Sequence, residues 1–348
     1  MGGCAEDSGP ITIGAAGPFS EGFGQENLRG IRLAVEEINA RGGIRGRELV
    51  VLERDDGGDG ARAATIAGEF LARRELVAVV GHVSSGAMVA AAKVYDAGLP
   101  AVATTATAPA LSGISPWVFR VISSDSTNGV DLARFAAERG FRRAAILYEN
   151  DSYGRGLMDT FRSHFRGEIV ALDPMVADPD DFEPYVAYYR QVGPDLVFVA
   201  GTERSGRAFL REAKRQGLDA AFLGGDGWAG VVADPGAAEG AFIGTPFTVS
   251  DTRPAARRFV EAYRARYGTD PDANAALAYD ATMLVAAAIA AVGPDRAAIR
   301  DYLAGLTEAT AHQGVTGPIH FDENGDPVGK SFVMTRVTGG VLTPEVDR

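Results

Sequence analysis

The chain has 348 residues, of which 46% are apolar and 23% are charged, and its formal net charge is −12. This composition is typical of a soluble globular protein that is long enough for two domains. Because lysine and arginine are scattered along an acidic chain, no basic face is available for phosphates, and we expect no nucleic-acid partner.

The chain begins MGGCAEDSGP and contains a single cysteine, Cys4, so an intrachain disulfide is impossible. Gly-Gly-Cys followed by small, polar, helix-breaking residues is similar to the end of a lipoprotein signal. This interpretation predicts lipidation of Cys4 and a tether over residues 1–10. The alternative is an ordinary flexible N-terminus that happens to contain a cysteine.

From residue 11 on, short β-type runs alternate with helical patterns. The expected strands of the N-terminal part are 11–14, 48–53 and 77–80. The expected helices between them have apolar faces at Leu28, Ile31, Val35 and Ile38 and at Ile66, Ala67, Phe70 and Leu71. Short strands between helices of about a dozen residues predict βαβ units and parallel sheets, whose ligands bind beyond the carboxyl ends of the strands.

The same arrangement occurs twice. Residues 77–109 and 196–228 both contain an apolar strand, Gly-x-x-x-Ser-Gly, a helix, Gly-Leu, a second strand and a polar loop. The corresponding positions are Gly81, Ser85 and Gly86 in the first copy and Gly201, Ser205 and Gly206 in the second. At this offset Thr107 lies opposite the neighbourhood of Asp226. We therefore predict two similar α/β lobes.

The C-terminal part predicts no third lobe. Its expected elements are a helix marked by Phe259, Tyr263 and Tyr267, an apolar helix over 273–292, and β-type runs at 319–321 and 331–337. Asn324-Gly325 is a turn signal between these two runs. The longest apolar stretch, 283–292, is too short to span a bilayer and indicates a buried helix. These pieces would pack back onto the two lobes, so we expect the chain to cross between the lobes several times.

Signals for catalysis or metal binding are weak. The segment 81–86 does not match the Gly-x-Ser-x-Gly nucleophile elbow, and His82 within it is interpreted as a residue that packs at a strand end. No phosphate-binding glycine motif is present. The acidic loops 55–60 and 322–327 both fail the calcium-loop rule. We expect a protein that is not an enzyme and that holds no cofactor or metal.

The first of the matched loops contains the groups that bind a carboxylate. Ser85 is expected at a helix N-terminus, where backbone N–H groups lack helical partners and the helix dipole is positive. Thr105 and Thr107 follow the next strand. Hydroxyls, amides and a helix start suit an anion without any lysine or arginine. The alternative is that Ser85 only caps the helix.

The second matched loop, Gly224 to Trp228, contains Asp226 among glycines that let a backbone come close. A half-buried carboxylate at a strand end favours a cation as its partner, so Asp226 is a candidate for binding an ammonium group. The alternative is a turn residue or helix cap. An anion site on one lobe and a cation site on the other predict a zwitterion, such as the α-carbon head of an amino acid.

Residue runs along nearly the whole chain resemble the type I periplasmic-binding-protein superfamily, in the branch of leucine/isoleucine/valine-binding proteins of ABC transporters. These runs include VVGHVSSG, ATTATAPALS, YENDSYGRG, FLGGDGW and GVTGPIHFDENGD, in this order. The resemblance implies an α/β fold of two Rossmann-like lobes with parallel sheets, joined by multiple hinge crossovers. Lobe 1 would comprise 11–122 plus 250–327, and lobe 2 would comprise 123–249 plus 328–348.

The resemblance also implies the ligand-binding residues. Ser85, Thr107 and the Thr105 carbonyl would hold the carboxylate and ammonium groups, with Asp226 as the acidic partner of the ammonium. Tyr153 would close over the ligand.

Further positions concern the ligand's side chain. Phe23 would line its pocket. Thr202, Glu203 and Ala276 fall at or near positions that are often aromatic in the branched-chain binders, which predicts a more polar and roomier pocket. The two cysteines of the family disulfide are replaced here by Gly58 and Ser84.

The function that the resemblance implies is that of an extracytoplasmic, monomeric solute-binding protein, lipid-anchored through Cys4. It would capture a branched-chain amino acid or similar small zwitterion and deliver it to the membrane permease of an ABC transporter. A ligand-sensing module of a signalling receptor is the alternative on the same fold. A hydrolase is disfavoured because no nucleophile–base pair is visible.

Overall fold

The computed structural model describes residues 9–175 and 181–345, and the chain divides into two compact units. Unit 1 is formed by described residues of the segments Met1–Ala106, Ala110–Ile122 and Arg253–Val328. Unit 2 is formed by those of Thr107–Pro109, Ser123–Thr252 and Gly329–Arg348. Cys4, the predicted lipidation site, lies outside the described residues.

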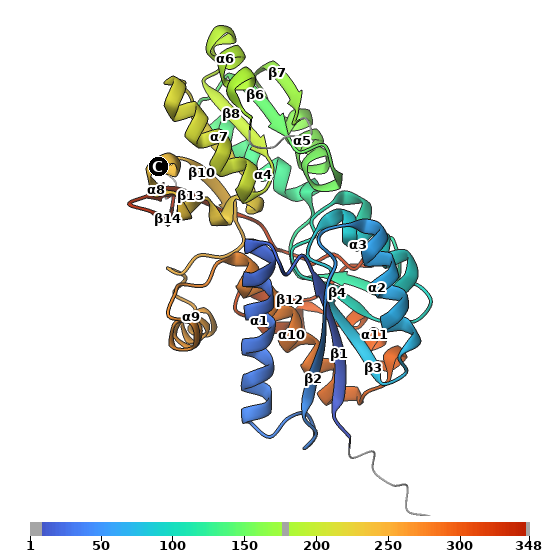
Figure 1. The fold of residues 1–348 in the computed structure, drawn as a ribbon. Helices are drawn as coiled ribbons and strands as arrows, with labels where there is room; N and C mark the ends of the chain where they lie inside the picture. Colours follow the sequence, from blue (N-terminus) through green and yellow to red (C-terminus); the bar gives the residue numbers. More distant parts are fainter. Residues whose placement is uncertain (1–8, 176–180, 346–348) are drawn as a thin grey trace, which may run out of the picture. The chain divides into compact units, whose positions relative to one another are not determined.

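Unit 1 is built on a five-stranded parallel sheet with the strand order β2-β1-β3-β4-β5 (Figure 1). Its strands are β1 (Ile11–Gly17), β2 (Leu49–Asp55), β3 (Leu76–Gly81), β4 (Ala101–Ala103) and β5 (Val118–Arg120). Its α-helices are α1 (Gly22–Ala40), α2 (Gly60–Ala72), α3 (Ser85–Tyr95), α9 (Pro254–Tyr267), α10 (Ala273–Val292) and α11 (Arg296–Ala304). The shorter elements are η1 (Pro109–Leu111), which begins in unit 2, η3 (Glu308–Thr310), β11 (His312–Gly314) and β12 (Gly317–Ile319).

The core of unit 1 follows from the apolar patterns of its elements. Every residue of β3 is buried. Helices α2 and α3 pack against each other over one face of the sheet, with Phe70, Met88 and Tyr95 fully buried in their shared core. Burial of a side chain the size of phenylalanine contributes about 1.5–3 kcal/mol. Helices α1 and α10 form a second packed pair in this unit.

Helix α10 has the bounds that the sequence predicts, 273–292. In the described part of the chain it is the one helix long and apolar enough to cross a membrane, but most of it is buried within the protein. The apolar stretch 283–292 is only the second half of α10, whose 20 residues are enough to span a bilayer. Burial identifies α10 as a core helix, because Leu284, Val285 and Ile289 have no exposed surface.

Unit 2 contains a seven-stranded sheet with the order β14-β13-β10-β9-β8-β6-β7. Its strands are β6 (Arg143–Tyr148), β7 (Glu168–Pro174), β8 (Leu196–Ala200), β9 (Ala221–Gly224), β10 (Phe242–Thr245), β13 (Val333–Thr338) and β14 (Val341–Pro344). Its helices are α4 (Asp125–Glu138), α5 (Ser152–His164), α6 (Glu183–Val192), α7 (Glu203–Gln216), η2 (Asp226–Ala233) and α8 (Pro235–Ala238).

The two sheets share one topology. The parallel strands β7-β6-β8-β9-β10 of unit 2 repeat the order β2-β1-β3-β4-β5 of unit 1, so the predicted pair of similar α/β lobes is confirmed. In unit 2, β13 and β14 extend the parallel sheet in antiparallel fashion. This extension was not predicted.

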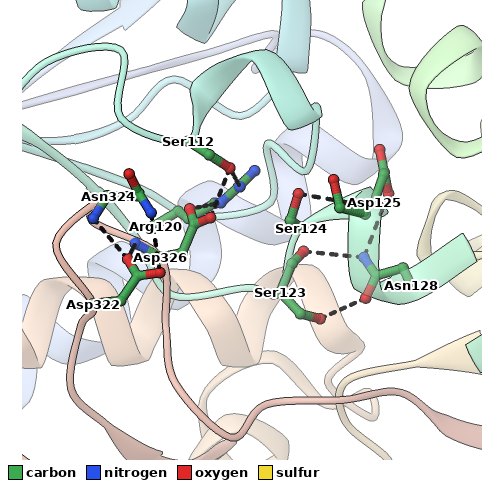
Figure 2. Close-up of polar contacts among 10 residues, drawn as sticks. Ser112, Arg120, Ser123, Ser124, Asp125, Asn128, Asp322, Asn324 and Asp326 are labelled. Carbon is green, nitrogen blue, oxygen red and sulfur yellow. Dashed lines mark hydrogen bonds and ion pairs between the residues drawn. The ribbon is translucent and has the colours of Figure 1, made fainter. Parts of the chain in front are cut away.

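The Asn324-Gly325 turn is present, but the β-type runs that flank it do not pair with each other. Gly325 has φ +77°, and one oxygen of Asp322 accepts the N–H groups of Asn324 and Asp326 at 2.9 Å each (Figure 2). Within unit 1, β12 pairs with β11, whereas β13 pairs with β10 and β14 in unit 2. The turn instead closes a short antiparallel bridge between Phe321 and Pro327, and β13 extends the unit 2 sheet at β10.

The acidic loop around this turn has protein partners of its own. The carboxylate of Asp326 accepts hydrogen bonds from the buried guanidinium of Arg120 at 2.6 Å and from the hydroxyl of Ser112 at 2.7 Å (Figure 2). In the described part of the chain, no group of three or more His, Cys, Asp or Glu side chains has an arrangement that could hold a metal ion. The loop is therefore a structural turn stabilised by an ion pair.

Candidate functional site

The Gly-x-x-x-Ser-Gly segment of unit 1 lies between β3 and α3, beyond the carboxyl end of the central strand. Ser84 occupies the N-cap position, with φ −80° and ψ 140°, and its side chain makes no capping hydrogen bond. Ser85 is the first residue of α3 and is 4% exposed. Ser84 rather than Ser85 therefore stands at the N-cap position, and Ser85 lies in the first turn, at the positive end of α3.

The threonines that follow β4 have different roles. The Thr105 hydroxyl donates a hydrogen bond to the Val83 carbonyl at 3.1 Å, which joins this segment to the β3–α3 loop. The Thr104 hydroxyl accepts one from the Asn27 side chain at 2.9 Å. Thr107 is fully buried, belongs to unit 2, and accepts the N–H of Asp125 on its carbonyl at 2.9 Å.

A buried polar array lies next to the β3–α3 loop. His82 Nδ1 is 2.6 Å from a carboxylate oxygen of Asp56, and His82 Nε2 is 2.9 Å from the Tyr95 hydroxyl. All three side chains are buried, and burial raises the pKa of Tyr95 well above its usual value, so its phenol stays protonated. The prediction for His82 was only that it packs at a strand end, and sequence analysis missed both of its partners.

The same array joins the two loops that the family disulfide would link. A Cβ atom added at Gly58 would lie 3.4 Å from the Ser84 hydroxyl oxygen, so these two positions are neighbours. Asp56 lies in the loop that contains Gly58, and His82 lies in the loop that contains Ser84. The buried hydrogen bonds therefore hold together the loops that no disulfide holds in this chain.

In unit 2, Asp226 is the first residue of η2 and follows β9. The Tyr153 hydroxyl, from the first turn of α5, donates to the Asp226 carboxylate at 3.0 Å and accepts the N–H of Gly227 at 3.0 Å. Burial raises the pKa of Asp226 to about 6, although hydrogen bonds from Tyr153 and from backbone N–H groups limit the rise. No lysine or arginine among residues 9–175 and 181–345 forms an ion pair with Asp226.

Trp228 fixes the turn that carries Asp226. Its indole is fully buried, and a Cβ added at Gly224 or Gly206 would lie 2.2 Å or 2.6 Å from the indole. The glycines before Trp228 were interpreted as room for an approaching backbone. The structure uses the space at Gly224 for the indole, and a Cβ at Gly227 would meet the Tyr153 hydroxyl at 2.8 Å.

The residues predicted to lie around the ligand's side chain belong to different elements of the two units. Thr202, the N-cap residue of α7, donates both its N–H and its hydroxyl to Glu149 at 2.9 and 2.7 Å. Glu203 begins α7 and lies 3.6 Å from the Arg207 guanidinium. In unit 1, Phe23 is half-buried in the first turn of α1, and Ala276 is fully buried in α10.

A cavity of about 390 Å³ lies elsewhere in unit 1, and none of the predicted site residues lines it. It is bordered by residues of α1, α9 and α10, among them Glu37, Arg258 and Tyr279. The Tyr279 hydroxyl donates to Glu37 at 3.0 Å, so part of its polar lining is already paired. The polar groups of Ser85 and Asp226 lie instead at the carboxyl edge of the sheet of their own unit.

The two α/β units have the same topology, and each has polar groups at the carboxyl edge of its sheet, where open α/β folds bind their ligands. The sequence model of the family described as periplasmic binding protein matches residues 10–340, and the chain belongs to this family. The Leu/Ile/Val/Thr-binding protein of Salmonella typhimurium is 30% identical over 338 residues, which cover 94% of this chain and 90% of the relative.

Solved structures agree with this assignment. The branched-chain amino acid transporter substrate binding protein of Streptococcus pneumoniae, in complex with isoleucine, is 30% identical with a TM-score of 0.90, covering 96% of this chain and 97% of that one. The ABC transporter substrate-binding protein of Desulfitobacterium hafniense, in complex with Leu, is 32% identical with a TM-score of 0.84, covering 97% and 100%. The predicted type I periplasmic-binding fold is confirmed.

Proposed function

We propose that this chain is an extracytoplasmic solute-binding protein that binds one small amino acid and delivers it to the permease of an ABC transporter. The observation that carries the proposal is Asp226, a half-buried carboxylate with a raised pKa that forms no ion pair with a lysine or arginine of the described residues. A ligand ammonium group supplies the cation that this environment lacks. The family and the names of its relatives support transport over ligand sensing by a signalling receptor.

The carboxylate of the ligand binds at the start of α3. Ser85 and the first-turn N–H groups of this helix spread the negative charge, and Thr105 holds the loop through Val83. Asp226 binds the ammonium group and is oriented by Tyr153. Thr107 completes the polar contacts. The family and the named relatives are binding proteins, which supports a protein that is not an enzyme.

The ligand class is a branched-chain amino acid or a similar small zwitterion. The relatives bind leucine, isoleucine, valine or threonine by name, and two of the solved structures hold isoleucine or leucine. Phe23 lines the side-chain pocket in this proposal. Thr202, Glu203 and Ala276 make that pocket more polar and less crowded than aromatic residues would, which favours tolerance of a polar side chain.

The proposal includes an extracytoplasmic location, a monomer and a membrane permease as partner. The family and its named relatives support the location and the transport context. Lipid anchoring through Cys4 stays a prediction.

A thermal-shift screen over the common amino acids tests the proposed function. A ligand at about 100 times its dissociation constant adds about 2.7 kcal/mol of stability, which corresponds to a rise in melting temperature of about 4 °C for a chain of this length. We expect this rise with one or a few small amino acids. If none of the free amino acids raises the melting temperature, the proposed function is wrong.

The raised pKa of Asp226 predicts a pH-dependent affinity. A ligand ammonium group binds the ionised carboxylate, so below about pH 6 a proton must leave Asp226 before the ligand binds. We expect constant affinity from about pH 7 to 8 and a loss that approaches tenfold per pH unit as the pH falls below about 6.

Isothermal titration of the parent and of Asp226→Asn across this pH range measures the effect. The variant has no carboxylate at this position, so its weaker binding should not change between about pH 5 and pH 7. Parallel pH profiles for parent and variant would contradict the assignment of the titrating group to Asp226.

A further inference from the structure

Glu149 places a carboxylate at the start of α7. One of its oxygens accepts three hydrogen bonds, from the Thr202 N–H at 2.9 Å, the Thr202 hydroxyl at 2.7 Å and the Ser205 hydroxyl at 2.8 Å. Thr202 is the N-cap residue of α7, and Ser205, in its first turn, is 1% exposed. A helix start, a backbone N–H and hydroxyls are the groups that bind a carboxylate without any basic side chain.

This site is the counterpart in unit 2 of the β3–α3 site in unit 1. Ser205 corresponds to Ser85 in the sequence repeat, and α7 follows β8 as α3 follows β3. The neighbouring strands also correspond, because β6 pairs with β8 as β1 pairs with β3. The two helices therefore follow corresponding strands, although α7 begins two residues earlier in the repeat, so that Ser205 is the third residue of α7 and Ser85 the first of α3.

The strand register identifies the counterpart of Glu149. Tyr148 pairs with Ala200 in unit 2, and Ala15 pairs with Val80 in unit 1, so the next residue along is Glu149 in one unit and Ala16 in the other. The Glu149 N–H also bonds to the Ala200 carbonyl at 2.9 Å, which continues the register. Ala16 has only a methyl group where Glu149 has a carboxylate. Glu149 is therefore one of the differences between the two repeats at this edge of the sheet, and another is Thr202, which donates two of the three hydrogen bonds to Glu149 and has His82 as its counterpart.

We propose that Glu149 is a built-in carboxylate that fills, in unit 2, the anion site whose equivalent in unit 1 accepts the carboxylate of the ligand. A second carboxylate at the start of α7 would face Glu149 at short range, and like charges in a partly buried site repel strongly. Only unit 1 is then left to accept the ligand's carboxylate. The orientation of the ligand rests on the proposed function, whereas the role of Glu149 at α7 does not.

Replacement of the side chain by a small free carboxylate tests this role. Glu149→Ala empties the site and leaves its donors in place, whereas Glu149→Gln fills it with a neutral group of the same shape. The melting temperature of each protein is measured in sodium formate and in sodium chloride at equal concentration. We expect Glu149→Ala to melt below the parent in chloride, and formate to restore at least about 2 °C of the loss.

The controls separate a specific site from a general salt effect. Formate should change the parent and Glu149→Gln no more than chloride does, and adding Ser205→Ala to Glu149→Ala should reduce the rescue. A formate effect that is absent from Glu149→Ala, or equal in all proteins, would overturn the proposal. If Glu149→Ala does not fold in chloride, its refolding yield is compared in the two salts. A higher yield in formate supports the proposal, and an equal yield contradicts it.

The result is independent of the proposed function. Rescue by formate in a protein that binds no amino acid would support the role of Glu149 at α7 and reject amino acid binding. Amino acid binding by the parent without rescue of Glu149→Ala would reject this role of Glu149 and leave the proposed function intact.

Discussion

Replacing Asp226 with alanine is expected to weaken binding of the amino acid by about 30- to 5000-fold, since loss of one member of a desolvated charge pair costs about 2–5 kcal/mol. The substitution leaves the ligand ammonium without its partner. It also leaves the Tyr153 hydroxyl, which bonds to Asp226 at 3.0 Å, without its acceptor. The ligand-free protein should keep its fold, because ionised Asp226 is disfavoured by burial at neutral pH.

Two further variants make this result specific. Ser85→Ala removes one neutral hydrogen bond, worth about 0.5–1.5 kcal/mol, and leaves the first-turn N–H groups of α3 in place. It should therefore weaken binding less than Asp226→Ala does. Asp234→Ala is the matched control in the same segment, because that carboxylate caps α8 and pairs with Arg211. Titration calorimetry with the best amino acid ranks the three, and unchanged affinity in Asp226→Ala would leave Asp226 as a turn residue only.

Replacing Trp228 with alanine is expected to destabilise unit 2 by about 3–5 kcal/mol, the usual cost of truncating a buried aromatic side chain. Trp228 has no exposed surface, and Gly206 and Gly224 lie against its ring where larger residues would not fit. The cavity left by the indole cannot be refilled by either glycine. Because Trp228 also anchors the turn of Asp226, the variant should lose ligand affinity as well.

Urea unfolding followed by circular dichroism measures the loss of stability. Trp117→Ala is the matched control, since Trp117 is only half-buried, lies in unit 1, and has the Arg300 guanidinium 5.2 Å from its ring centre. Trp117→Ala should lower the free energy of unfolding by less than Trp228→Ala does. A Trp228→Ala protein within about 1 kcal/mol of the parent would show that the indole is not the anchor of this turn.

Local patterns predicted most of the fold. The apolar face of α1, the buried strand β3 and the full length of α10 each follow from a hydrophobic pattern within a short stretch of sequence. The repeat of Gly-x-x-x-Ser-Gly predicted two similar lobes, because the same local sequence builds the same βαβ unit, and the two sheets have the same order of parallel strands. The antiparallel pairing of β13 was not predictable in this way, since its partner β10 is about 90 residues away.

The candidate site was predictable only in part. Ser85 and Asp226 stand in loops whose composition indicates binding, and the structure places each beyond the carboxyl end of a strand. His82 and Asp56 are 26 residues apart, and Glu149 and Ser205 are 56 apart, so no sequence spacing signals these contacts. Glu149 can be recognised as a site residue only when the sequence repeat is combined with the strand register, which shows that its counterpart in unit 1 is Ala16.

The central claim is that this protein recognises both charged ends of a free amino acid. Titration calorimetry of the best amino acid from the screen, its N-acetyl derivative and its carboxamide tests this claim most directly. The N-acetyl derivative lacks the ammonium group for Asp226, and the carboxamide lacks the carboxylate for the start of α3. We predict tight binding of the free amino acid and a loss of about 30-fold or more for each derivative. Equal affinity for the free amino acid and either derivative would contradict the account.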